Sequence, residues 1–317
     1  MIFPILFAVV FLVFCSPYMY SCITWNYSLL LFASIFMYTN FVLYTILAII
    51  YFLLPASVVS SLLLHINKII RNLFPEKIEE TERNIRETFK MKVLYPMPEK
   101  SINIWHPHGI SGVTPVIHNG YRVTNIPGYT PTKGVVYYYY FMLPIIKDII
   151  RLLNAVPSDY RTIKETVEKE SLSITIGGLD EMGRTADKHI QLVIKKRSGI
   201  FKIALETGTP LVPVLTYGET EVFPETNNAF LLQFNKFIYS TFTMKFPFPT
   251  LISVSNWLKL GTIPLPEIKS YTGRPIIVKK INNPSLSQIN KLRKIYISRI
   301  QELFDETNPG EYALEII

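Results

Sequence analysis

Two histidines separated by one proline form the segment best suited to chemistry. The run reads Trp105-His106-Pro107-His108-Gly109-Ile110. Proline fixes its own φ and restricts the residue before it, while glycine permits a tight turn or a close backbone approach. Such a segment can hold an imidazole rigidly, and histidine has a pKa suited to removing a hydroxyl proton near neutral pH. The run therefore predicts a general base that can remove a proton from a hydroxyl group.

The same His-x-His spacing also suits a metal pair or a histidine that caps a turn. A zinc site needs further ligands, and the remaining histidines are His65, His118 and His189, to which Asp or Glu could be added. The cysteines, Cys15 and Cys22, both lie in apolar sequence and predict neither a disulfide framework nor a Cys-based site. We expect no metal, and a metal-dependent hydrolase remains the alternative enzyme class.

Short β-type runs alternate with helical patterns after residue 100. This alternation predicts an α/β domain around a mixed, mostly parallel sheet. The first expected strand, 101–105, ends directly before His106, and sites in such sheets gather at the carboxyl ends of strands. Further strands are expected at 134–141, 172–176, 211–215 and 275–278, and helices at 75–91, 159–170 after a Ser158 cap, 199–206, and 284–304 after an Asn283 cap.

The beginning of the chain is free of formal charge. The first Asp, Glu, Lys or Arg is Lys68, whereas about 20 apolar residues suffice to cross a bilayer. Two spans are expected, 2–20 and about 29–54, and the basic residues that follow them mark the cytoplasmic side. The sequence therefore predicts a transmembrane hairpin over 1–67 and a membrane-associated domain over 68–317 on the cytoplasmic side.

The net charge of +8 and the pI near 9.2 indicate anionic partners. For a chain tethered to a membrane, lipid headgroups or an anionic cosubstrate fit this charge better than nucleic acid, which we do not expect as a partner. Lys195, Lys196 and Arg197 precede a helix expected to begin near Ser198-Gly199. A helix N-terminus beside basic residues can bind phosphate, although a solvated charge run is the alternative.

Six blocks, in chain order, resemble the diacylglycerol acyltransferase-2 family, which includes monoacylglycerol and wax-alcohol acyltransferases. The His106–Gly109 block is that family's signature, and the likeness extends over roughly residues 70–310. The typical N-terminal hairpin adds to it. The other five blocks are Leu143–Asp148, Ile176–Glu181, Arg197–Ile200, Leu211–Glu219 and Gly273–Ile276.

The resemblance implies acyl transfer from acyl-CoA, as cosubstrate and with no other cofactor, to a lipid alcohol. Diacylglycerol, converted to triacylglycerol, is the expected acceptor, with monoacylglycerol or a wax alcohol as alternatives. The family also implies a glycerophosphate-acyltransferase-like fold, contact with membrane lipids at the endoplasmic reticulum, and compatibility with a homo-oligomer. A non-catalytic lipid-binding protein that kept this fold is a further alternative.

The distantly related glycerophosphate acyltransferases place an Asp five positions after their histidine, where it orients the imidazole. Here those positions hold Ser111, counted from His106, and Val113, counted from His108. The resemblance therefore implies a carboxylate from elsewhere, and Glu181 is the candidate. We assign His108 as the base and His106 as its support, with the reverse order open.

Two glycines of the same block are candidates for binding a developing oxyanion. The backbone N–H groups of Gly177 and Gly178 could stabilise that charge, and a plain turn is the alternative. The chain departs from the family pattern at Ile200, where an aromatic residue is usual, and over 154–160, which reads NAVPSDY. These departures weaken the assignment of diacylglycerol as acceptor more than the assignment of acyl transfer.

Overall fold

The computed structural model describes residues 71–109, 112–121, 126–142, 146–182, 188–222, 228–242 and 267–317, with isolated positions between 42 and 69. Both expected spans lie outside this description except at three positions of the second. Among the described residues, no helix combines the length and the apolar character needed to cross a bilayer. The chain divides into two compact units, Met1–Ile69 with Tyr139–Ile149, and Ile70–Tyr138 with Ile150–Ile317.

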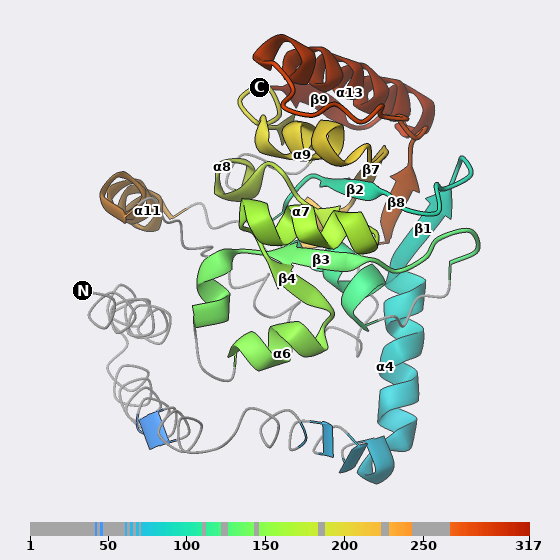
Figure 1. Ribbon diagram of the computed structural model, residues 1–317. Coiled ribbons are helices and arrows are strands. Elements are labelled where there is room, and N and C mark those ends of the chain that lie inside the picture. Colours follow the sequence, from blue (N-terminus) through green and yellow to red (C-terminus); the bar gives the residue numbers. More distant parts are fainter. Residues whose placement is uncertain are drawn as a thin grey trace. The chain divides into compact units, whose positions relative to one another are not determined.

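The second unit is built on a seven-stranded sheet in the order β1-β8-β7-β2-β5-β3-β4 (Figure 1). All neighbouring strands run parallel except β7 and β8, so the predicted mixed, mostly parallel sheet is confirmed. A separate parallel pair joins β6 to β9. The strands are β1 Phe89–Val93, β2 Ile102–His106, β3 Lys133–Val136, β4 Ala155–Pro157, β5 Leu172–Ile174, β6 His189–Leu192, β7 Leu211–Tyr217, β8 Ile268–Thr272 and β9 Ala313–Ile316.

The central strand β2 is buried along its whole length. Because side chains alternate across a strand, Ile102 and Ile104 join the main apolar core, whereas Trp105 joins a smaller cluster with Tyr129 and Val214. Helices α7, α9 and α13 contribute to the main core on one side of the sheet (Figure 1). The helices are α4 Pro75–Thr88, α5 Val113–Pro115, η1 Val116–Tyr121, η2 Tyr138–Met142, α6 Ile146–Leu152, α7 Tyr160–Lys169, α8 Gly178–Met182, α9 Gly199–Thr207, α10 Glu219–Val222, α11 Ala229–Phe242 and α13 Leu286–Thr307.

The two predicted helix caps are wrong by one and two residues. Helix α7 is capped by Asp159, whose side chain accepts from the N–H of Thr162 at 2.9 Å, and not by Ser158. Helix α13 is capped by Ser285, which forms a reciprocal capping box with Gln288, and not by Asn283. In each case the cap is the residue with extended backbone whose oxygen reaches the N–H three positions on.

Three expected elements differ most from the structure. The helix expected over 75–91 ends at Thr88, because the buried Phe89 begins strand β1. The strand expected over 134–141 ends at Val136, and the tyrosines that follow are exposed. The strand expected over 275–278 is wrong: Ile276 makes only an isolated bridge to Leu211, and β8 pairs with β7 instead.

Candidate active site

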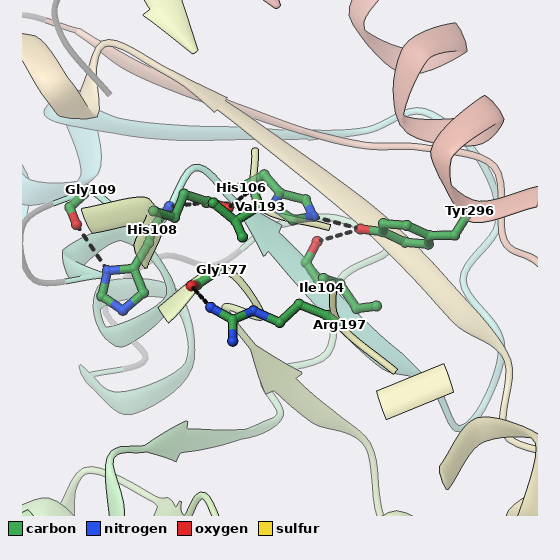
Figure 2. Close-up of polar contacts among 9 residues, drawn as sticks. Ile104, His106, His108, Gly109, Gly177, Val193, Arg197 and Tyr296 are labelled. Carbon is green, nitrogen blue, oxygen red and sulfur yellow. Dashed lines mark hydrogen bonds and ion pairs between the residues drawn. The ribbon is translucent and has the colours of Figure 1, made fainter. Parts of the chain in front are cut away.

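His106 lies at the carboxyl end of β2 and is fully buried. Its Nε2 lies 3.0 Å from the Tyr296 hydroxyl (Figure 2). Its Nδ1 lies 3.6 Å from Oε1 of Glu181. The second distance is too long for a hydrogen bond and describes an electrostatic contact. Both ring nitrogens of His106 therefore face protein groups and not solvent.

Glu181, in α8, is also fully buried and holds the chain after His106. Its Oε1 accepts from the backbone N–H of His108 at 2.7 Å, and its Oε2 accepts from the N–H of Val193 at 3.0 Å. Burial alone would raise the pKa of this carboxyl, but the nearby His106 imidazole and the Val193 N–H hold the pKa below its usual value. Glu181 is therefore a carboxylate at neutral pH.

The His108 ring is partly exposed, and its hydrogen bond identifies the basic nitrogen. Nδ1 lies 2.9 Å from the carbonyl oxygen of Gly109, with the ring turned toward that oxygen (Figure 2). A carbonyl oxygen only accepts, so Nδ1 carries the hydrogen and Nε2 of the neutral ring carries the lone pair. This arrangement can remove a proton from a hydroxyl group placed at Nε2.

Gly177 and Gly178 form the turn that brings Glu181 to the histidines. A Cβ built on Gly177 would lie 2.0 Å from Oε2 of Glu181, so a side chain cannot be accommodated there. Gly178 has φ +55°, a conformation that favours glycine. The two glycines thus allow the close approach of the carboxylate, a role independent of any contact with an oxyanion.

Replacing Gly177 by alanine is expected to destabilise the protein by about 1–3 kcal/mol, because the added methyl must displace Glu181. Thermal unfolding of the purified protein measures this change. Gly134→Ala is the matched control, since a Cβ there would meet its nearest neighbour, the Ala155 Cβ, at 4.0 Å. A Gly177→Ala protein with the melting temperature of the wild type would contradict the close packing.

Arg197 reaches the same turn from the segment before α9. One guanidinium nitrogen, Nη2, donates to the carbonyl oxygen of Gly177 at 2.6 Å (Figure 2). The same nitrogen donates to Oδ2 of Asp180 at 2.8 Å. The backbone oxygen of Arg197 in turn accepts from Arg293 at 3.2 Å. The guanidinium therefore secures the Gly177–Glu181 turn.

The other basic and small residues predicted to bind phosphate are exposed to solvent. Lys196, Ser198 and Gly199 are exposed, and α9 begins at Gly199 with no side-chain cap from Ser198. Their predicted role in binding phosphate remains a prediction. Within the described residues, no group of three or more His, Cys, Asp or Glu side chains is placed to hold a metal ion.

Two site residues were missed from the sequence. Tyr296 occupies the buried stripe of α13, where its hydroxyl reaches His106, and its only signal was a polar group in an apolar stripe. Glu219 is 2 % exposed and accepts from the Val113 N–H at 3.0 Å and from the Thr114 hydroxyl at 2.7 Å. Glu219 is the last residue of the Leu211–Glu219 block, and its place in that block was the sequence signal that could have identified it.

Comparison with known proteins gives a consistent family. A model of the diacylglycerol acyltransferase family matches residues 37–313. The chain is 27% identical over 212 residues to diacylglycerol O-acyltransferase 1 of Eremothecium gossypii, covering 64% of this chain and 46% of that one. It is 28% identical to 2-acylglycerol O-acyltransferase 1 of Bos taurus (66% and 65% covered) and 27% identical to acyl-CoA wax alcohol acyltransferase 2 of Homo sapiens (65% and 65% covered).

The chain thus spans between about half and two thirds of the length of these relatives. Among solved structures, it aligns with the 1-acyl-sn-glycerophosphate acyltransferase of Thermotoga maritima at a TM-score of 0.43 and 15% identity, covering 85% of this chain and 89% of that one. The family model covers most of the chain and includes every site residue described above. The chain therefore belongs to the diacylglycerol acyltransferase family.

Proposed function

We propose that this protein is an acyl-CoA-dependent O-acyltransferase that joins a fatty acyl group to a lipid alcohol, with diacylglycerol as the acceptor. The observation that carries the proposal is the His108 ring, partly exposed and oriented through Nδ1 so that Nε2 is the basic atom. Family membership supplies the reaction class. Relatives named for 2-acylglycerol and wax alcohol make monoacylglycerol and long-chain alcohols the alternative acceptors.

In the proposed reaction, Nε2 of His108 takes the hydroxyl proton as the acceptor oxygen attacks the thioester carbonyl. A carbon–oxygen bond forms, and the carbonyl oxygen becomes an oxyanion. Collapse of this intermediate breaks the carbon–sulfur bond, and the departing thiolate of coenzyme A takes the proton back from His108. The products are the ester and free coenzyme A.

The buried groups keep His108 in place during this cycle. Glu181 binds the backbone N–H of His108, and the contact with Tyr296 anchors His106, two positions earlier. We assign stabilisation of the oxyanion to the N–H groups of Gly177 and Gly178. Lys196, Ser198 and Gly199 are exposed at the start of α9 and are assigned to the phosphates of acyl-CoA.

We further propose that the domain works at the cytoplasmic face of the endoplasmic reticulum membrane, where both substrates partition. The basic net charge of +8 supports contact with anionic headgroups. The charge-free sequence before Lys68 supports anchoring through the proposed hairpin.

An acceptor panel tests the proposal. Microsomes from an expressing host receive labelled acyl-CoA with diacylglycerol, monoacylglycerol or a long-chain alcohol, and the labelled lipids are separated. We expect triacylglycerol as the main product, and none above background from a His106→Ala/His108→Ala double variant. Preferred labelling of another acceptor would reassign the substrate, whereas undiminished labelling by the double variant would overturn the site.

A further inference from the structure

Glu219 is a buried acid that the proposed chemistry does not use. It begins α10, directly after the strand β7 that pairs with β2, and only 2 % of it is exposed. Its two oxygens bind the backbone N–H of Val113 and the hydroxyl of Thr114, which itself is fully buried. Both partners begin helix α5, a few residues after His108.

The carboxyl also lies against the histidine turn itself. A Cβ built on Gly109 would lie 3.0 Å from Oε1 of Glu219, so that side chain packs directly on Gly109. The carbonyl of this glycine is the group that accepts from Nδ1 of His108. The N–H of Gly112 donates to the carbonyl oxygen of His108 at 3.0 Å.

Two buried carboxyls therefore hold the turn from different strand ends. Glu181 follows β5 in the chain and accepts from the N–H of His108. Glu219 follows β7, accepts from the N–H of Val113 and packs on Gly109. The backbone that carries the Nδ1 acceptor of the catalytic histidine lies between these two attachments.

We propose that Glu219 is a positioning residue, which fixes the Gly109 carbonyl so that His108 presents Nε2 to the acceptor hydroxyl. This inference rests on the proposed function. Glu219 acts through its contacts with Gly109 and with Val113 and Thr114 at the start of α5. A displacement of about 1 Å in such a group can lower a rate roughly a hundredfold.

The property that matters is the pair of hydrogen bonds and not the charge. Burial raises the pKa of Glu219 to about 7, so the carboxyl changes its protonation near neutral pH. Its protonated form can still accept from Val113 and can donate to the Thr114 oxygen. A glutamine offers the same acceptor and donor, so Glu219→Gln should keep the turn whereas Glu219→Ala should release it.

The test compares these two variants with the wild type in steady-state acyl transfer and in amide hydrogen exchange. We expect Glu219→Ala to lower kcat at least tenfold with KM for acyl-CoA within about twofold, and Glu219→Gln to stay within about threefold of wild type. Peptides covering 106–121 should exchange faster in Glu219→Ala alone. Glu221→Ala is the matched control, since this acid of the same helix binds Tyr312 at 2.5 Å instead.

The outcomes separate this inference from the proposed function. Faster exchange at 106–121 with unchanged kcat in Glu219→Ala would overturn the positioning role and leave the acyltransferase assignment standing. Unchanged exchange in that variant would overturn it as well, whatever the rates. A wild type without acyltransferase activity whose 106–121 peptides are nevertheless protected from exchange would instead overturn the proposed function, and the positioning role of Glu219 with it.

Discussion

Replacing His108 by alanine is expected to lower kcat for acyl transfer by roughly 10²–10⁴-fold, the usual contribution of a positioned general base. The partly exposed ring, with Nδ1 committed to Gly109, leaves Nε2 as the atom that takes the proton. KM for acyl-CoA should change little, because the ring is not assigned to hold the donor. Initial rates with purified protein and labelled acyl-CoA measure both quantities.

His189→Ala is the matched control for this variant. His189 is half exposed on β6 and lies 3.6 Å from Glu315 on the neighbouring strand, outside the histidine turn. Its removal should leave kcat unchanged. A His108→Ala protein that keeps more than a tenth of the wild-type kcat would show that another group removes the proton.

Replacing Glu181 by alanine is expected to destabilise the fold by about 2–6 kcal/mol, because each of two buried N–H groups left without an acceptor costs about 1–3 kcal/mol. The change leaves the N–H groups of His108 and Val193 without their acceptor and removes the charge facing His106. The stability of Glu181→Gln should lie between those of the wild type and Glu181→Ala, because the glutamine amide oxygen can accept a hydrogen bond whereas the amide nitrogen cannot. Chemical denaturation of the purified proteins measures the differences.

The low pKa of Glu181 also predicts how the stability difference between the wild type and Glu181→Gln depends on pH. Its pKa in the folded protein is below the ordinary value of 4.5, so its contribution is complete above that pH and is lost as pH falls through the folded pKa. The stability gap between wild type and Glu181→Gln should therefore narrow in acid. Glu302→Ala, which removes an exposed partner of Arg299, should leave the melting temperature unchanged. A gap that widens in acid would contradict the ionised state of Glu181.

Local patterns predicted the strand that ends at the histidine turn but not the groups that surround this turn. The alternation over 101–105 ends at His106, so the position of strand β2 followed from period and turn residues alone. Tyr296 lies 190 positions from His106, and Glu219 lies 106 positions from Val113. Such contacts depend on how helices and strands pack, which no single-sequence pattern contains.

The contacts of Arg197 were also not contained in the sequence. Its guanidinium binds Asp180 and Gly177, and its predicted role in binding phosphate remains a prediction. The tyrosines after Val136 illustrate how composition misleads. Aromatic residues favour strands, yet the chain continues from β3 into the short helix η2, and these tyrosine side chains are exposed. Glu181 was found through the family resemblance, because an isolated loop Glu is ordinarily solvated.

The central claim, that His108 is the base of acyl transfer, can be tested most directly on the unaltered protein. Limited reaction with diethylpyrocarbonate, followed by peptide mass spectrometry, gives the modified fraction of each histidine beside the remaining activity. His106 and His118 are buried and should be protected, whereas the exposed His65 and His189 should react without effect on activity. The account predicts that activity falls in proportion to modification of His108. Activity that persists after complete modification of His108 would contradict it.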